Sequence, residues 1–366
     1  MKKIGIDARL YSQTGVGTYI KNLIYYLEKK EFKDIVFYIY LMPDDYDCLL
    51  FKNKNIIKRV ADYRWHSFKE QIGFALKLYR DKLDLMHFTY FSYPVLYCKK
   101  FIATVHDTTP LLFKTGKAST KNQFVYKVKH LFFRIILRCQ IKRSIKIITP
   151  TFTVKEQLED IYGKKISKKI LPIYEGVNYK IIKTMGNKDL SKKFNNFFIY
   201  VGNFYPHKNV EKLIYAFKNI DKKYKLILLG PDDYFSNRIL RCIDTSKSGN
   251  NISLFKNPNL EDLVFFYKNA LALIHPSLSE GFGLPLVEAA YFNTPIIASN
   301  IKVFKELLGN NYLSFNPNSI DDIAGKINSF IENKPEFDYK NIIKEYSFSK
   351  MTDETLKIFK DTLSLI

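Results

Sequence analysis

The sequence contains few cysteines and no long segment without charged residues. Its four cysteines, Cys48, Cys98, Cys139 and Cys242, are widely spaced and form no C-x-x-C pair. This spacing argues against a disulfide framework or a zinc site and favours a reducing compartment. The N-terminal MKKIGIDARL enters a strand-like run without the apolar core of a signal peptide. We therefore expect a cytoplasmic protein without a membrane-spanning segment.

The length and the patterning of the chain predict two α/β domains. A chain of 366 residues with 46% hydrophobic content and no low-complexity tract suits two cores of about 150 to 200 residues each. Short apolar strands alternate with amphipathic helices, and this alternation starts again in the second half of the chain. Strands are expected at 2–10, 34–42, 83–88, 100–107, 195–204, 224–231, 271–277 and 294–299, and helices at 17–27, 66–82, 210–220 and 260–270.

The two halves also share a local pattern. YIYLMPDDY at 38–46 and YKLILLGPDDY at 224–234 both run from an apolar strand into Pro-Asp-Asp-Tyr, although four identical residues can arise by chance. The polar stretch 178–196 is the expected hinge or linker. We predict two Rossmann-like domains, with the ligand site in the cleft between them at the carboxyl ends of the strands.

Positive charge is concentrated in the first half. Residues 1–180 hold 34 Lys and Arg against 16 Asp and Glu, whereas residues 181–366 hold 24 against 20. Such an excess suggests an anionic partner, either nucleic acid, a phospholipid surface or a phosphorylated substrate.

The basic excess is greatest between 108 and 155, which contains eleven Lys and Arg and no Asp or Glu. Apolar residues recur at helical spacing in 121–143. A cationic stripe lies about a quarter-turn away, formed by Lys127, Arg134, Arg138 and Lys142. The stripe predicts binding to an anionic membrane surface, while the apolar face predicts packing against the core of the domain; both hold if the apolar face points inward.

Glycines mark the turn between the first strand and the first helix. Gly15 and Gly17 allow close approach of a ligand to the backbone. The turn is not a dinucleotide fingerprint, because Ile20 stands where G-x-G-x-x-G needs its third glycine. It predicts contact with a phosphate or an acceptor, or otherwise a plain tight turn.

The stretch HPSLSEGFGLPLVEAA at 275–290 places two glutamates around a second glycine-rich turn. Pro285 suits the first position of a helix, so the amides of 282–284 should lie near a helix N-terminus that can bind a diphosphate or a sugar oxygen. Glu280 lies in the turn. Glu288, one helical turn later, could accept hydrogen bonds from two adjacent hydroxyls, or could simply be a glutamate on a helix face.

Other polar residues are weaker candidates when each is taken alone. Lys208, near a helix N-terminus, could neutralise a leaving diphosphate or be a solvated lysine. His106, at a strand end, could bond a substrate hydroxyl or only the backbone. No Ser or Cys stands in a nucleophile elbow. Asp45 and Asp47 form a D-x-D without a supporting ligand nearby in sequence, so we expect no metal.

With these motifs in view, the sequence resembles the retaining glycosyltransferases of family 4, which have the GT-B fold. SEGFGLPLVEAA is similar to the E-x7-E motif of the family. IDARLYSQTGVGTYIKNL, RWHSFKEQ, LDLMHFTYFSYP, TVHDTTPLL, IITPTFTVKEQL, YEGVN and YVGNFYPHKNVEKLIYAF follow in the family's order. The resemblance implies an acceptor-binding domain at 1–178, a donor-binding domain at 196–345, and a C-terminal helix at 346–366 that returns to the first domain.

The resemblance also implies roles for single residues. Glu288 is expected on the nucleotide ribose, Lys208 on the diphosphate, and His106 near the transferred sugar. Many members have arginine where this chain has Asn203, a loss for which His207 could compensate. The implied catalytic residues are His106, Lys208 and Glu280. The implied donor-binding residues are Gly15, Val16, Gly17, Asn203, His207, Lys208, Glu280, Gly281, Phe282, Gly283, Leu284 and Glu288.

The family implies transfer of a hexose from a nucleoside diphosphate sugar, with retention and without a cofactor. The form GNFYPHKN resembles mannosyltransferases of bacterial surface polysaccharides, which makes GDP-mannose the first expectation for the donor. The expected acceptor is lipid-linked or a lipopolysaccharide, and the expected location is the inner face of the cytoplasmic membrane. A UDP-sugar donor and a sugar-nucleotide epimerase are alternatives, and the non-enzyme alternative is a nucleic-acid-binding protein.

Overall fold

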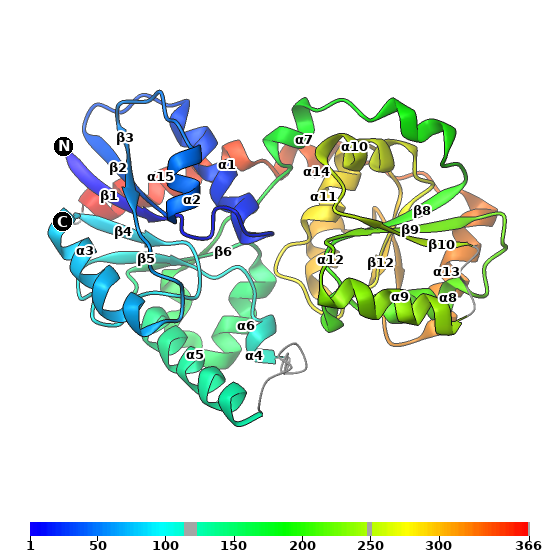
Figure 1. The fold of residues 1–366 in the computed structure, drawn as a ribbon, viewed down its shortest axis with the longest axis horizontal. Helices are drawn as coiled ribbons and strands as arrows, with labels where there is room; N and C mark the ends of the chain where they lie inside the picture. Colours follow the sequence, from blue (N-terminus) through cyan, green and yellow to red (C-terminus); the bar gives the residue numbers. More distant parts are fainter. Residues whose placement is uncertain (113–122, 247–250, 365–366) are drawn as a thin grey trace. The chain divides into compact units, whose positions relative to one another are not determined.

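The protein folds into two units. The computed structural model describes residues 1–112, 123–246 and 251–364, with the backbone alone for 112 and 123–129. The first unit comprises Met1–Glu175 and Ser347–Ile366, and the second comprises Gly176–Tyr346 (Figure 1). Each unit is built around its own parallel sheet.

The sheet of the first unit has the order β3-β2-β1-β4-β5-β6-β7. Every neighbouring pair in it is parallel. The strand order reverses between β1 and β4, which is where ligands bind in Rossmann-like folds. Its strands are β1 (Lys2–Asp7), β2 (Ile35–Leu41), β3 (Ile56–Val60), β4 (Leu85–Phe88), β5 (Phe101–Thr104), β6 (Lys146–Thr149) and β7 (Ile170–Pro172).

The sheet of the second unit has the order β10-β9-β8-β11-β12-β13 and is also parallel. Here the order reverses between β8 and β11. The strands β2 and β9, which lead into the shared Pro-Asp-Asp-Tyr, occupy equivalent places in the two sheets. The strands are β8 (Phe197–Val201), β9 (Lys225–Gly230), β10 (Ile252–Lys256), β11 (Leu273–His275), β12 (Ile296–Ser299) and β13 (Leu313–Phe315).

Helices connect the strands in both units. In the first unit they are α1 (Val16–Glu28), α2 (Pro43–Cys48), the π-helical turn η1 (Glu70–Phe74), α3 (Ala75–Asp81), α4 (Thr109–Leu112), α5 (Gln123–Arg143), α6 (Phe152–Tyr162), η3 (Lys164–Lys169) and α15 (Phe348–Ser364). In the second unit they are α7 (Tyr179–Lys183), η4 (Lys188–Lys192), η5 (Pro206–Lys208), α8 (Val210–Phe217), α9 (Tyr234–Ser246), α10 (Leu260–Asn269), α11 (Leu284–Tyr291), α12 (Lys302–Leu308), α13 (Ile320–Asn333) and α14 (Lys340–Glu345).

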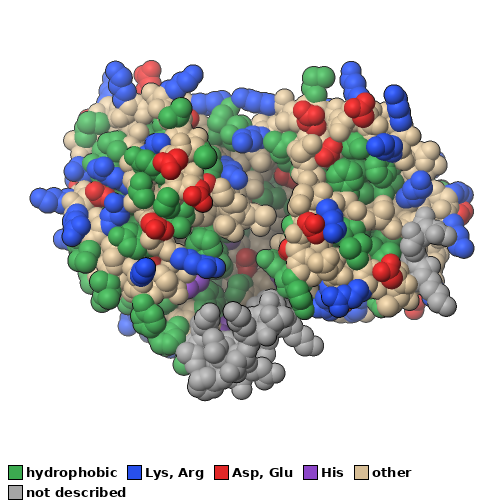
Figure 2. Space-filling view, viewed as in Figure 1, with side chains coloured by type: hydrophobic (Ala, Val, Ile, Leu, Met, Phe, Trp, Pro, Cys, Tyr) green, Lys and Arg blue, Asp and Glu red, His purple; other side chains and the backbone are tan. Residues whose placement is uncertain are grey.

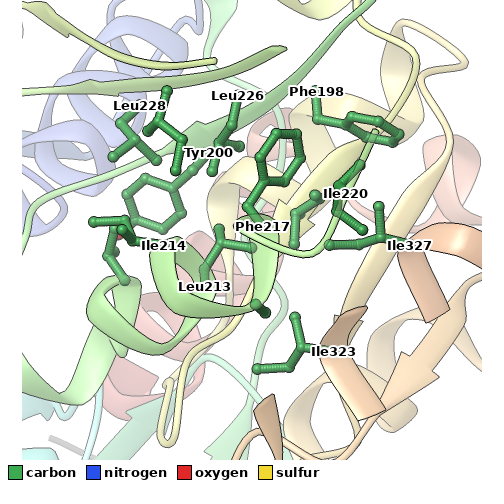
Figure 3. Close-up of a cluster of buried hydrophobic side chains, with 14 of the residues drawn as sticks. Phe198, Tyr200, Leu213, Ile214, Phe217, Ile220, Leu226, Leu228, Ile323 and Ile327 are labelled. Atoms are coloured by element: carbon green, nitrogen blue, oxygen red, sulfur yellow. The ribbon is translucent and has the colours of Figure 1, made fainter. Parts of the chain in front are cut away.

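The strands β2 and β8 are buried along their whole length, as strands of a sheet covered on both faces are expected to be. In the second unit, Phe198 and Tyr200 of β8 meet Phe217 of α8 and Ile323 and Ile327 of α13 (Figure 3). Each such side chain contributes about 1.5 to 3 kcal/mol on burial. This core holds the carboxyl ends of β8 and β11 in fixed positions.

The C-terminal helix belongs to the first unit, as the GT-B resemblance implied. The helix α15 packs on α1. Lys30 pairs with Asp353 at 2.5 Å, and the ring of Phe359 lies against Phe37 and His87. The last helix therefore completes the core of the first unit.

The stretch 178–196 is not a free linker but part of the second unit. The helices α7 and η4 both pack on α10, with Ile181 and Leu190 buried. The backbone N–H of Asn187 donates to the carbonyl of Glu261, and its amide donates to Asp262 Oδ1 at 2.9 Å. Each of these two short helices buries one apolar residue. A single buried residue produces no helical periodicity, so the helices could not be recognised in a Lys- and Asn-rich sequence.

The apolar face expected on the helix at 121–143 faces the core only in part: Cys139 packs against it, and the side chains of Phe124 and Val128 lie outside the described residues. Leu131, Phe132 and Ile135 are exposed by 58%, 53% and 48%, whereas Leu137 and Ile141 are buried. Helical spacing predicts a stripe, but a helix with two apolar stripes can bury only the one that its neighbours cover. Hydrophobic side chains reach the surface at the lower left of Figure 2, in the region that holds α3 and α5 in Figure 1.

Candidate active site

Glu280 lies in the turn between β11 and α11 and accepts three hydrogen bonds on one oxygen. Lys208 Nζ donates to its Oε1 at 2.6 Å, Ser277 Oγ at 2.7 Å and His275 Nε2 at 3.0 Å. Burial opposes ionisation, but the charge of Lys208 and the bond from His275 outweigh it and hold the pKa of Glu280 well below its usual range. Glu280 is therefore a fixed carboxylate, and the lone pairs of Oε2 are left for a ligand hydroxyl.

His275, the last residue of β11, is a site residue that the sequence did not single out. Its ring lies between Tyr200, with centroids 5.6 Å apart, and Phe304, at 5.5 Å. Burial lowers the pKa of His275 despite the neighbouring carboxylate. A neutral ring that donates from Nε2 to Glu280 has an acceptor at Nδ1, and this atom is buried without a partner within the described parts of the chain. Its position at a strand end, five residues before Glu280, was the available signal.

Lys208 is positioned by a loop that is fastened at several points. It ends the turn η5, and Asn209 follows with a positive φ of 60° before α8 begins. The side-chain amide of Asn209 donates to the carbonyls of Pro276 and Pro317 at 3.1 and 2.8 Å. The loops after β8, β11 and β13 are thereby joined, and the ammonium of Lys208 points at Glu280.

Asn203 and His207 lie on the same loop as Lys208. Asn203 Oδ1 and His207 Nδ1 are both buried without a hydrogen-bond partner among the described residues. Burial and the charge of Lys208 lower the pKa of His207 to about 4. At neutral pH His207 can donate a hydrogen bond, but it carries no positive charge. It therefore does not replace the charge of the arginine that many family members have at the position of Asn203.

The sequence predicted Pro285 at the first position of a helix. The helix α11 begins one residue earlier, at Leu284, so Pro285 is its second residue. Gly283 precedes it with φ 107°, and a Cβ there would lie 3.1 Å from the ring of Phe304, so glycine is required. Gly281 and Phe282 complete the turn, with Phe282 buried edge-on against Tyr346. No acidic residue lies in the first turn of α11, whose dipole therefore favours an anion.

Glu288 lies one turn into α11 in a very different environment from Glu280. Its Oε2 accepts from the Tyr267 hydroxyl of α10 at 2.8 Å. Burial raises the pKa of Glu288 to about 7, although the bond from Tyr267 acts in the opposite direction. The two glutamates of the motif thus have pKa values displaced in opposite directions, because only Glu280 has a cation beside it.

In the first unit, the glycine turn leads directly into α1. Gly15 has φ 54° and precedes Val16, the first residue of the helix. Gly17 is required for space, since a Cβ there would lie 2.6 Å from the carbonyl oxygen of Tyr11. The turn follows the carboxyl end of β1, next to the point where the strand order reverses.

His106 follows β5 and has contacts at both ring nitrogens. Nδ1 lies 3.1 Å from Glu175 Oε1, and Nε2 lies 2.9 Å from the carbonyl oxygen of Thr89. Both partners are acceptors, so both bonds form together only when the ring carries two N–H groups. Tyr19 packs edge-on against the ring at 4.8 Å. Glu175, within YEGVN, is the partner that sequence reasoning missed.

A second buried ion cluster in the first unit was also missed. Arg9 pairs with Asp7 at 2.6 Å and with Glu70 at 2.7 Å, and Ser92 donates to Glu70. Burial acts to lower the pKa of Arg9, but the two carboxylates raise it overall. The cluster joins the segments after β1, β3 and β4. Glu70 begins η1, so the helix expected at 66–82 starts as a π-helical turn.

The D-x-D pair lies on α2 and not in a metal cluster. Asp45 accepts a hydrogen bond from Ser12. Among the described residues, no group of three or more His, Cys, Asp or Glu could hold a metal ion.

Of the predicted membrane-binding stripe, Lys127 lies outside the described side chains. Arg134, Arg138 and Lys142 are exposed on α5. Along the described parts of the chain, no helix is long and apolar enough to cross a membrane.

Comparison with known proteins decides the family. The signature of Glycosyl transferases group 1 matches residues 182–349. The O-antigen chain mannosyltransferase RfbU of Salmonella typhimurium is 32% identical over 260 residues, which cover 69% of this chain and 71% of that protein. The chain belongs to this family. It is therefore a glycosyltransferase, and the resemblance to family 4 is confirmed.

Other relatives agree with this assignment. The group 1 transferase is 26% identical over 174 residues to O-antigen chain mannosyltransferase B of Escherichia coli, covering 44% of this chain and 45% of that one. Sucrose-phosphate synthase of Thermosynechococcus elongatus has the same fold, with a TM-score of 0.79 over the whole of both chains at 16% identity. HepE of Anabaena, solved with UDP and glucose, gives 0.76 at 15% identity over 99% of this chain and 100% of that one. The GT-B fold is thus confirmed.

Proposed function

We propose that this group 1 transferase moves mannose from GDP-mannose to a hydroxyl of a lipid-linked or polysaccharide acceptor, with retention at the anomeric carbon. The choice of sugar is supported by the mannosyltransferases among its relatives. The observation that carries the site assignment is Glu280, a fixed carboxylate beside Lys208 and the N-terminus of α11.

In this proposal the second unit binds the donor. Glu280 Oε2 accepts from a sugar hydroxyl, and Glu288 accepts from the ribose. The diphosphate lies at the start of α11, where the helix dipole and the charge of Lys208 stabilise the negative charge that grows on the leaving group. His207 and Asn203 contribute hydrogen bonds to the same phosphates.

The proton from the acceptor hydroxyl passes to the leaving phosphate in this mechanism. The new glycosidic bond forms on the same face from which the phosphate departs, so the configuration is retained. Catalysis then consists of positioning and charge stabilisation. In the first unit, the Gly15–Gly17 turn and His106 are proposed to border the reacting sugar.

Substitutions at the Glu280–Lys208 pair test the site. Lys208→Met or Glu280→Gln should reduce transfer from GDP-mannose at least about a hundredfold, because preorganised charge is removed where it acts. Lys212→Met is the matched control, since this lysine lies on the adjacent helix α8 and contacts only the Asn318 carbonyl in the described structure. Near-normal turnover in both site variants would contradict the assignment.

A UDP-sugar donor is the second candidate, favoured by the UDP and glucose bound to the structurally similar HepE. Calorimetric titration with GDP-mannose and UDP-glucose, followed by transfer assays with each, decides between the two donors. Product analysis without acceptor separates a transferase from an epimerase, because an epimerase converts the nucleotide sugar alone.

We also propose that the protein works at the inner face of the cytoplasmic membrane, held there by the basic side of α5. Arg134, Arg138 and Lys142 support this proposal through their exposure and charge. Binding to phosphatidylglycerol vesicles that is lost at high salt is the expected result, and binding equal to that of neutral vesicles contradicts it.

A further inference from the structure

We propose that a groove between α5 and α6 binds the phosphate-bearing end of a single lipid chain, with the phosphate on Arg134 and Arg138. The inference deepens the proposed function, on which it rests, by assigning the lipid of a lipid-linked acceptor to one site in the first unit.

The groove is lined by apolar and cationic side chains together. Its volume is about 690 Å³, within the range of about 300 to 1,000 Å³ usual for small-molecule sites. The lining residues are Leu111, Leu131, Arg134, Ile135, Arg138, Ile161 and Tyr162.

The apolar side chains that line the groove are unusually exposed to solvent. Leu131 and Ile135 are about half exposed, and Ile161 of α6 is exposed by 38%. These side chains share one concave surface, so water covers apolar area that a chain of methylene groups would bury. Each methylene group that a lipid buries in the groove stabilises the complex.

The cations at the groove have no carboxylate partner among the described residues. The segment 108–155 contains no Asp or Glu, and in the described structure neither Arg134 nor Arg138 forms an ion pair. Both guanidinium groups act on the Tyr162 hydroxyl, whose pKa burial raises while their charges lower it. Two guanidinium groups and one hydroxyl therefore line the groove together with its apolar side chains. Guanidinium groups bind phosphate in a forked geometry.

The concave shape of the groove favours a single lipid chain over a flat bilayer surface as its ligand. The cationic stripe alone would treat Arg134, Arg138 and Lys142 alike, yet only the first two line the groove. Similarly, Phe132 is as exposed as Ile135 on the same helix, but only Ile135 lines the groove. These two comparisons supply matched controls.

The test measures binding of farnesyl diphosphate, a soluble apolar chain with a phosphate end, to the full chain by calorimetry. We expect one molecule bound per chain, and much weaker binding of farnesol or inorganic diphosphate, each of which lacks one half of the ligand. Arg134→Gln with Arg138→Gln, or Ile135→Ser, should weaken binding about tenfold or more. Lys142→Gln and Phe132→Ser should leave it within twofold.

Two outcomes overturn the groove assignment. One is a loss of binding in Lys142→Gln equal to that in the double variant Arg134→Gln with Arg138→Gln. The other is binding of phosphatidylglycerol vesicles without saturable binding of farnesyl diphosphate, which places the lipid contact on the bilayer surface. Since no donor is present, the result is independent of transfer. Binding of farnesyl diphosphate without binding of a nucleotide sugar supports the groove assignment and contradicts the proposed function. Binding of a nucleotide sugar without binding of farnesyl diphosphate supports the proposed function and contradicts the groove assignment.

Discussion

Affinity for a nucleotide sugar should rise with pH through the ionisation of Glu288. Burial raises the pKa of this carboxyl group to about 7 in the absence of ligand. The pKa of His207 is lowered to about 4 and that of His275 is also lowered, both chiefly by burial. Glu288 is therefore a group of this cluster whose pKa lies inside the interval from pH 6 to 8.

The size of the effect follows from the pKa. About one Glu288 in eleven is ionised at pH 6 and about ten in eleven at pH 8. If the ribose hydroxyls donate to the ionised carboxylate, affinity rises about tenfold over this interval, which corresponds to about 1.4 kcal/mol. The hydroxyl of Tyr267 can donate to either form and does not cancel the change.

Calorimetry with GDP-mannose and UDP-glucose at pH 6, 7 and 8 measures this dependence, because the diphosphate diester of a nucleotide sugar does not titrate in this range. Glu288→Gln keeps the size of the side chain and an acceptor oxygen for Tyr267 but removes the ionisation. Its affinity should be flat with pH. A flat response in the unaltered protein, or the same slope in both proteins, would refute the role given to Glu288.

Three further predictions concern stability and positioning. The free energy of unfolding should fall by up to about 3 kcal/mol as pH rises from about 4.5 to 7, because native Glu288 holds its proton more tightly than the unfolded chain; chemical denaturation of Glu288→Gln should lack this component. His275→Phe keeps the aromatic packing but removes one donor to Glu280, so thermal stability should change little while calorimetry shows donor affinity about tenfold weaker, and unchanged affinity would contradict a positioning role. Arg9→Met leaves Glu70 buried without its cation and should destabilise the first unit by about 3 to 5 kcal/mol, followed by fluorescence of the single tryptophan in that unit; adding Glu70→Gln should restore part of the loss.

The sequence predicted the fold well, because strand patterning and the order of the motifs depend on local spacing. The carboxyl ends of β8 and β11 carry Lys208 and Glu280 as expected. The sequence could not predict that the two glutamates of one motif would have opposite pKa displacements, since these depend on residues 21 and 72 positions away, Tyr267 and Lys208.

The same reasoning explains what sequence analysis missed. Periodicity in 121–143 indicates an apolar stripe but not which stripe α6 and the sheet cover, so it could not predict that Leu131 is exposed while Leu137 is buried. Pairs such as His106 with Glu175 and Arg9 with Glu70 join residues more than sixty positions apart, and no local signal links them.

Asn209 shows how narrowly some positions of this chain are restricted. It must adopt a left-handed backbone conformation and also supply an amide that reaches two carbonyl groups. Glycine meets only the first demand, aspartate has no N–H to donate, and glutamine is longer and less suited to positive φ. Variation that retunes the donor specificity of this protein is therefore expected around Asn209 and not at it, so libraries that randomise this loop will recover asparagine at this position.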